Sequence, residues 1–342
     1  MMNRKKKIVI IGGGLAGLAL AMKFCERNGE VTVVSYQSLK RSHSVCAQGG
    51  INAAIDAKNE GDSPEKHFYD TIKGGDFLAH QPLVRDMCFQ APAIIHLMDR
   101  MGVAFNRTGE GHLDFRRFGG TLYNRTAFAG ATTGQQLVYA LDEQVRRNIN
   151  DGNATALEWH EYLGAVLDSD GICRGAVIHD LKTDEIYTLP ADAVVLATGG
   201  PGQVYGRSTN SVVNTGAAAT TAYLQGAKYA NGEFIQIHPT AIPGQDKLRL
   251  MSESARGEGG RVWVPRKPND KRTPEKIPEN ERLYFLEEKY PLFKNLVPRD
   301  VASREIYDIV YNQKMGVDGD PMVYLDLTHK SREFLDNRLG GI

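Results

Sequence analysis

A short apolar run that leads into a glycine-rich turn constrains the fold of this chain more than any other feature. Residues 8–11 are wholly apolar, three glycines with the spacing G-x-G-x-x-G follow them, and residues 15–27 have helical composition. Residues 31–34 form a second, β-branched run. This order predicts a parallel βαβ unit with a right-handed crossover, and therefore an α/β fold.

The three glycines are spaced to admit a dinucleotide. Gly12 is expected to turn tightly, Gly14 to let a pyrophosphate approach the backbone, and Gly17 to let the helix pack on the sheet. Ser35 stands where an acidic residue normally ends the second strand and holds the ribose. The motif predicts dinucleotide binding and leaves open a nicotinamide-dependent dehydrogenase, or a turn that binds no ligand.

Composition excludes several other classes of protein. The chain has 342 residues, 42% of them hydrophobic, which argues against disorder, and its formal net charge of zero argues against nucleic-acid binding by bulk charge. Its four cysteines form no CxxC pair, so we expect neither a zinc site nor a disulfide scaffold. Glycines interrupt the apolar run at residues 8–22, so a soluble chain is expected, with any membrane link made through a partner.

The rest of the chain predicts a Rossmann-like domain followed by a second domain. Helices are expected at residues 63–73, 83–90, 92–101 and 134–148, an antiparallel β meander at 157–189, and a buried parallel strand at 193–197. We place the domain boundary near residue 235, giving domains 1–235 and 236–342, the latter an α+β capping domain. Within it, residues 265–282 are rich in proline and charge and are expected to form a mobile surface excursion.

One irregular loop carries the most specific motif. Residues 41–50 read RSHSVCAQGG, within a long loop of the kind that is usually functional. A single loop histidine is most often structural, but this string resembles the signature of the flavoprotein subunits of succinate dehydrogenase and fumarate reductase. The resemblance implies that FAD is bonded covalently, through its 8α carbon, to His43.

The resemblance extends along nearly the whole chain. It includes RFGG at residues 117–120, ATGG at 197–200, NTG at 214–216, the block at 238–260, and PRD at 298–300. Two departures concern the adenosine contacts, since many members have Glu where this chain has Ser35 and Asp where it has Ala217.

The resemblance also implies roles for particular residues. Glu253 and Arg256, three apart, would form a proton relay to the catalytic Arg299, whereas composition alone favours a surface ion pair. His238, expected at the end of an apolar strand at residues 234–240, would bind a substrate carboxylate instead of serving as a core histidine. The full set of implied residues is Arg299, Glu253 and Arg256 in catalysis; His238, Ser252 and Phe118 at the substrate; and Gly12, Gly13, Gly14, Leu15, Ala16, Gly17, Ser35, Ser42, His43, Ser44, Ala47, Gln48, Gly49, Gly50, Ala197, Thr198 and Gly199 at FAD.

By this resemblance the chain belongs to an enzyme that oxidises succinate to fumarate. A hydride passes to flavin N5, Arg299 takes a proton, and electrons leave through an iron-sulfur subunit to a quinone, with a membrane anchor subunit holding the complex on the cytoplasmic face of the cell membrane. The same residues would serve fumarate reduction. Open alternatives are an L-aspartate oxidase, which lacks the flavin-linking histidine, and a non-enzymatic flavin-binding fragment.

The resemblance raises a further expectation about completeness. Family members continue well beyond residue 342 and there supply more substrate and flavin contacts. No later strand in this sequence returns to the nucleotide-binding half. We therefore expect an N-terminal portion that holds the phosphate site, His43 and the relay, and that is catalytically incomplete when expressed alone.

Overall fold

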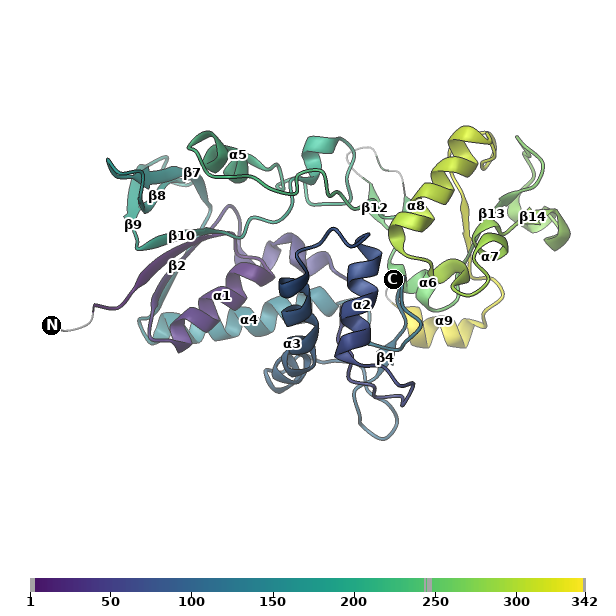
Figure 1. Cartoon of the computed structure of the whole chain (residues 1–342), viewed down its shortest axis with the longest axis horizontal. Helices are drawn as coiled ribbons and strands as arrows, with labels where there is room; N and C mark the ends of the chain where they lie inside the picture. Colours follow the sequence, from purple (N-terminus) through teal and green to yellow (C-terminus); the bar gives the residue numbers. More distant parts are fainter. Residues whose placement is uncertain (1–3, 243, 245–247, 341–342) are drawn as a thin grey trace. The chain divides into compact units, whose positions relative to one another are not determined.

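The structure is a computed structural model that describes residues 4–242, 244 and 248–340 (Figure 1). Contacts between Cα atoms divide the chain into two units. The first unit contains residues 1–47 and 134–235, and the second contains residues 48–133 and 236–342. The expected domains 1–235 and 236–342 stay a prediction, and residues 243, 245–247 and 341–342 of the expected capping domain lie outside the described residues.

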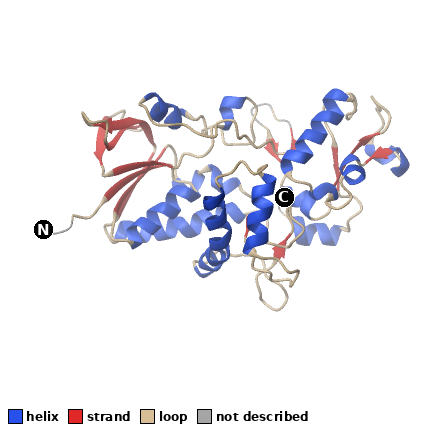
Figure 2. Cartoon of the chain, in the orientation of Figure 1, coloured by secondary structure: helices blue, strands red, loops and turns tan. Residues whose placement is uncertain are grey.

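The first unit is built on a parallel sheet. Its strands stand in the order β10-β1-β2-β6, and the register aligns Ile8 of β1 with Val31 on one side and Ala193 on the other. Figure 1 shows α1 and α4 running along this sheet, and Figure 2 separates its strands from its helices by colour. The elements are β1 Lys7–Ile11, α1 Leu15–Glu26, β2 Glu30–Ser35, α4 Thr133–Asn150, β6 Ala154–Glu158, β7 His160–Leu167, β8 Cys173–Asp180, β9 Ile186–Pro190, β10 Ala193–Leu196 and α5 Ala217–Leu224, with 3-10 turns at Leu39–Arg41, His43–Cys46 and Gly202–Tyr205.

The β meander packs on the parallel sheet. Strands β7, β8 and β9 pair antiparallel, and Ala176 and Ile178 of β8 join Val9, Ile11 and Val34 in one buried cluster. The α/β fold with a meander is therefore confirmed. The meander is shorter than expected, because residues up to Glu158 pair in parallel with β2.

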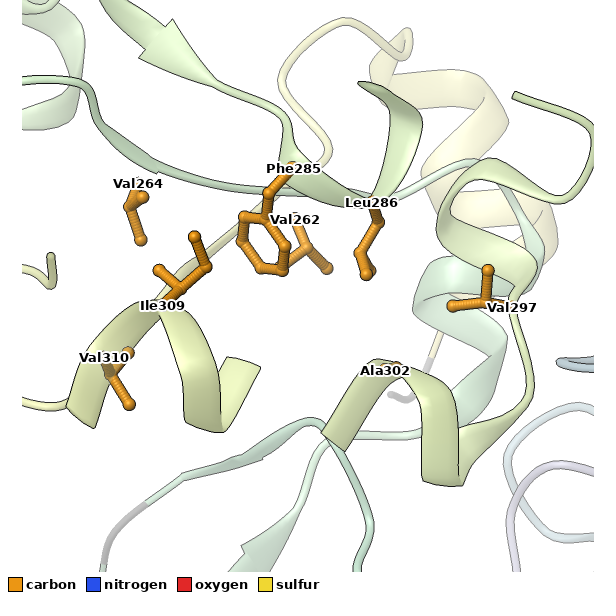
Figure 3. Close-up of a cluster of buried hydrophobic side chains, with 8 residues drawn as sticks. All are labelled: Val262, Val264, Phe285, Leu286, Val297, Ala302, Ile309 and Val310. Atoms are coloured by element: carbon orange, nitrogen blue, oxygen red, sulfur yellow. The ribbon is translucent and has the colours of Figure 1, made fainter. Parts of the chain in front are cut away.

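The second unit combines short sheets with helices around its own core. Side chains from β13, α7 and α8 converge there, as Figure 3 shows for Val262, Phe285 and Ala302. The elements are β3 Ile51–Asn52, α2 Pro64–Gly74, α3 Gln81–Arg100, β4 Phe115–Arg116, β5 Thr126–Ala127, β11 Ala241–Ile242, β12 Arg249–Leu250, α6 Glu253–Gly257, β13 Arg261–Pro265, β14 Arg282–Leu283, α7 Phe285–Lys289, α8 Arg299–Tyr307, β15 Tyr324–Asp326 and α9 Arg332–Leu339, with 3-10 turns at Pro274–Lys276, Glu279–Glu281 and Lys294–Leu296 and a π-helical turn at Asp308–Asn312.

Two expectations about local structure are wrong, and a third is met only in part. The two helices expected at 83–90 and 92–101 form one helix, α3, with Pro92 inside it. Burial of Ile95 and Met98 continues the apolar face beyond the proline, and α3 packs along α2. This packing outweighs the hydrogen bond that Pro92 removes.

The other two differences concern the second half of the chain. Ile277 is completely buried and packs with Trp263 and Tyr284, so the segment 265–282 is anchored at this point, while most of its other side chains are exposed, as expected for a surface segment. Residues 234–240 form no strand, because exposed side chains such as Phe234 and Ile237 have no sheet to pack against there. Across the described part of the chain, no helix is both long and apolar enough to cross a membrane.

Candidate functional site

The glycine turn of the first unit has the geometry that its spacing predicts. Gly12 has a φ of 114°, and a Cβ added there would lie 2.3 Å from the carbonyl oxygen of Ala197. A Cβ on Gly17 would lie 1.9 Å from the carbonyl oxygen of Gly12, so any side chain there would force α1 away from the turn. Gly14 caps α1 without a side chain, and no acidic residue occupies the first turn of that helix.

A cavity of about 630 Å³ opens beside this turn. Most of the expected FAD-binding residues of the first unit line it: Gly12, Gly13, Gly14, Leu15, Ala16, Ser35, Ser42, His43, Ser44, Ala197, Thr198 and Gly199. Two expected residues, Gly17 and Ala47, do not line the cavity. Gly17 packs beneath the turn, and the carbonyl of Ala47 accepts a hydrogen bond from Gly134 N (2.7 Å).

Sequence reasoning missed two segments of the lining. His160, Glu161 and Tyr162 come from β7, and residues 212–219 come from the loop before α5 and from the first turn of that helix. The Asn214-Thr215-Gly216 motif was a usable signal for the second segment. The β7 segment had no such signal in the sequence, because its position depends on how β6 pairs with β2.

The cavity residues fit a dinucleotide such as FAD. The volume of the cavity is within the range of cofactor pockets. The N-terminus of α1, which has no side-chain cap, offers backbone N–H groups to phosphate oxygens. Ser42 Oγ is buried without a hydrogen-bond partner in the described structure, as expected for a group that contacts a ligand. Ser44 Oγ accepts a 3.2 Å hydrogen bond from Leu15 N and so ties the histidine loop to the helix.

His43 lies in the 3-10 turn His43–Cys46 and lines the same cavity. Its Nδ1 accepts a 3.2 Å hydrogen bond from the backbone N–H of Ser211. This bond fixes the plane of the imidazole from a segment far along the chain. The histidine loop and the glycine turn are thus parts of one cavity in the first unit.

The last residues of the RSHSVCAQGG string, Gln48 to Gly50, belong to the second unit. Arg116 donates from Nε to the carbonyl of Gly49 (3.0 Å) and from Nη2 to that of Gln48 (3.3 Å). Phe118 lies against the other side of Gly49, where an added Cβ would come within 2.2 Å of its Cζ. Arg116 was not expected, although it directly precedes the RFGG motif.

Arg116 is unusual because it is buried without a carboxylate partner among the described residues. Burial lowers the pKa of Arg116 to about 10, so the guanidinium is still charged at neutral pH. Two backbone carbonyls and the ring of Phe128, 4.1 Å from Cζ, are its contacts. A charge held in this way fixes the Gln48–Gly50 segment rigidly.

A second cluster, which we call the relay cluster, consists of Glu253, Arg256, Arg299, His238 and Gln236. Helix α6 begins after Ser252, whose buried Oγ accepts a 3.3 Å hydrogen bond from Ser254 N. Arg256, one turn along α6, donates from Nη2 to Glu253 Oε1 and from Nη1 to the carbonyl of Asn295 (3.0 Å). Glu253 is 2% and Arg256 1% exposed, so the pair is not a surface ion pair.

Arg299 reaches the same carboxylate from α8. Its Nε donates to Glu253 Oε2 at 2.7 Å, and its Nη1 donates to Gln236 Oε1 at 2.7 Å. His238 Nε2 lies 3.3 Å from Glu253 Oε2, and its Nδ1 is 2.9 Å from the carbonyl oxygen of Thr240. The structure therefore brings the expected residues Arg299, Glu253, Arg256 and His238 together, and adds Gln236. Their roles in a reaction stay predictions.

The charges around Glu253 decide its protonation state. Burial acts to raise the pKa of this carboxyl, but the contact with His238 and the positive charges of Arg256 and Arg299 outweigh burial and hold the pKa at about 2. Burial lowers the pKa of Arg256 more than Glu253 raises it. Glu253 is consequently a carboxylate at neutral pH that bridges two guanidinium groups.

Comparison with known protein families identifies the class. A family model described as the FAD binding domain matches residues 7–342. The chain belongs to this FAD-binding family, as the flavoprotein subunits of succinate dehydrogenase and fumarate reductase do, so the resemblance carried by the His43 loop is confirmed at the level of the family.

Individual relatives are similar over nearly the whole of this chain. The chain is 61% identical over 338 residues to the succinate dehydrogenase flavoprotein subunit of Bacillus subtilis, covering 99% of this chain and 56% of that protein. It is 34% identical over 352 residues to the fumarate reductase flavoprotein subunit of Mycobacterium tuberculosis, with 99% and 56% covered. A structure of Escherichia coli quinol fumarate reductase matches with a TM-score of 0.81 at 31% identity, covering 99% of this chain and 56% of that one. The chain thus spans about half the length of these relatives.

Proposed function

We propose that this chain is part of a flavoprotein that oxidises succinate to fumarate and carries FAD attached covalently through His43. The observation that supports the chemistry best is the relay cluster, in which one buried carboxylate contacts both Arg256 and Arg299. The attachment rests on His43, which lines the dinucleotide cavity and whose ring is held by Ser211.

FAD, when bound, supplies the hydride acceptor for the reaction. The protein's own residues must then hold the dicarboxylate and remove one proton. His238 and Ser252 offer a ring nitrogen and a hydroxyl to a substrate carboxylate. Phe118, whose ring centroid is 6.0 Å from Arg299 Cζ, gives the guanidinium an apolar wall that limits its hydration.

Proton transfer falls to Arg299. A guanidinium rarely gives up its proton, so a base next to it is needed to pass that proton on. Glu253 is in position, since Oε2 contacts Arg299 Nε and Oε1 contacts Arg256 Nη2. In this proposal Glu253 first takes a proton from Arg299, which can then accept a proton from substrate. The proton on Glu253 leaves toward solvent by way of Arg256, which gives up one proton as it accepts another. The same groups run in reverse for fumarate reduction, the activity named for the Escherichia coli relative.

The electron partners follow from the relatives rather than from this chain. The Bacillus subtilis and Mycobacterium tuberculosis proteins are named as subunits, which implies assembly with other chains. We propose an iron-sulfur subunit that takes electrons toward a quinone, and an anchor subunit that holds the complex on the cytoplasmic face of the membrane.

Glu253→Gln in the complete enzyme tests the relay. Succinate-dependent dye reduction is expected to fall about 100-fold, with succinate binding retained, because the amide keeps a hydrogen-bonding oxygen but does not accept the proton. Glu288→Gln, at a half-exposed carboxylate paired with Arg266, is the control and is expected to keep full activity.

Two further measurements separate loss of the relay from loss of the fold. Glu253→Asp, which keeps the charge, is expected to recover part of the rate, and the melting temperature of each variant shows whether the cluster still folds. A folded Glu253→Gln enzyme with activity within about threefold of the parent would refute the relay.

A further inference from the structure

The cavity of the first unit lacks an acid at the place where a dinucleotide site normally has one. A carboxylate at the end of the second strand usually accepts hydrogen bonds from the adenosine ribose. In this chain that position is Ser35, which lines the cavity and carries no charge. A ribose bound here therefore requires its acceptor from another element.

Glu161 is the one acidic residue among the described residues that line this cavity. It belongs to β7 and stands between His160 and Tyr162, both of which are buried. Glu161 is less buried than its two neighbours, as the alternation of a strand requires when they face the core.

The sheet register places Glu161 close to the strand end that lacks the acid. Ser35 of β2 pairs with Glu158 of β6 in parallel register, so both strands end at the same edge of the sheet. Glu161 follows Glu158 by three residues and lines the same cavity as Ser35. This edge, beyond the carboxyl ends of parallel strands, is where such folds bind nucleotides.

Glu161 is also available, whereas Glu158 is not. Glu158 Oε1 accepts hydrogen bonds from Ser38 Oγ (3.1 Å) and Leu39 N (3.0 Å). For Glu161, no hydrogen bond or ion pair of the side chain occurs within the part of the chain that the structure describes. A carboxylate that lines a nucleotide cavity and has no hydrogen-bond partner there is suited to accept hydrogen bonds from two hydroxyl groups.

We propose that Glu161 binds the ribose hydroxyls of the adenosine half of FAD, in place of the acid that is missing at Ser35. The proposal depends on FAD binding by this family and not on succinate chemistry, so either proposal stands if the other fails. It makes Glu161 a determinant of cofactor affinity that lies outside the glycine motif.

The test measures FAD affinity in the full chain carrying His43→Ser, so that flavin exchanges freely. Titration of the flavin-free protein, followed by flavin fluorescence, is expected to show about tenfold weaker FAD binding for Glu161→Gln, the loss typical of one charge-assisted hydrogen bond. Glu185→Gln, at an exposed residue between β8 and β9 that does not line the cavity, is the control and is expected to bind FAD normally.

An FAD analogue with 2′-deoxyadenosine separates ribose binding from a structural role. The parent is expected to bind the analogue about tenfold less tightly than FAD, and Glu161→Gln to bind both equally. The proposal is wrong if Glu161→Gln weakens the binding of FAD and of the analogue by the same factor. It is also wrong if Glu161→Gln binds FAD as tightly as the parent does. Adding Ser35→Glu to Glu161→Gln restores an acid at the usual strand end and is expected to regain FAD affinity to within about threefold.

Discussion

Arg299 and Glu253 contact each other through a 2.7 Å hydrogen bond from Nε to Oε2, although they belong to different helices. Arg299 begins α8, after Pro298, and Glu253 begins α6, after Ser252. Because both stand at the first position of a helix, the contact depends on where α6 and α8 begin within the second unit. It leaves Arg299 with 30% of its side chain exposed, while Glu253 is closed off from water.

Replacing Arg299 with lysine in the complete enzyme is expected to reduce succinate turnover on the order of 10³-fold with little change in succinate binding. The guanidinium contacts Glu253 and Gln236 through two different nitrogens, and a single ammonium does not reproduce that fork. Steady-state kinetics and inhibitor binding measure the two effects. Arg304→Lys, at an exposed arginine paired with Asp300 in the same helix, is the matched control. A loss of tenfold or less would show that Arg299 only binds substrate.

His43→Ser is expected to leave FAD bound but no longer covalent. The glycine turn and the N-terminus of α1 do not depend on the imidazole, so the phosphate contacts persist. Acid-precipitated protein examined for yellow fluorescence reports the covalent flavin. Succinate oxidation is expected to fall more than fumarate reduction, because we expect the covalent bond to raise the flavin potential. An equal loss in both directions would contradict that explanation.

His67 makes the stability of the chain depend on pH. Burial, the largest cause, and the charge of Arg125 together lower the pKa of His67 to about 4, against the opposing charge of Asp62. Because the folded pKa is below the unfolded value of about 6.5, the unfolded state binds the proton first. Stability is therefore complete above pH 6.5 and declines as the pH falls toward 4, by about 2 kcal/mol between pH 7 and pH 5.

Urea unfolding at several pH values measures this decline. His67→Gln is expected to flatten the profile between pH 7 and pH 5, whatever its effect on stability at pH 7. His112→Gln, at an exposed histidine, is the control and is expected to keep the parent profile. A parent profile that is flat in this range would rule out His67 as a buried neutral group.

Gly17→Ala is expected to destabilise the first unit by about 2–3 kcal/mol and to weaken FAD binding, because its Cβ would lie 1.9 Å from the carbonyl oxygen of Gly12. Gly74→Ala is the matched control, since Gly74 ends α2 and has nothing within 4 Å of an added Cβ. Thermal unfolding and flavin titration of both variants make the comparison. Equal effects of the two substitutions would mean that the close packing at Gly17 is not what the motif requires.

Much of the first unit was predictable because its signals are local. The apolar run before Gly12, the helix after Gly14 and the strand that ends at Ser35 each follow from neighbouring residues. The N-cap of α2 was equally readable, since Ser63 Oγ accepts a hydrogen bond from Lys66 N as the Ser-Pro-Glu sequence predicts.

What the sequence did not reveal depends on distant partners. Arg116 looks like a surface charge until the carbonyls of Gln48 and Gly49 are placed beside it. Gln236 and Glu161 carry no motif, and their neighbours are set by helix packing in one case and strand register in the other. The anchoring of the charge-rich stretch around Ile277 was missed for the same reason, because it depends on how one fully buried side chain packs with Trp263 and Tyr284.

The central position of β1 also has a consequence for how the chain is made. β1 precedes both of its partners in the chain, and it pairs on one side with β2, which follows directly, and on the other with β10, whose Ala193 aligns with Ile8. At roughly 5–20 residues per second, that second edge stays open for about ten seconds or more of synthesis. During this interval β1 and β2 form a βαβ unit whose two outer edges are unpaired, because β6 and β10 come later in the chain, and such open edges can pair with other chains.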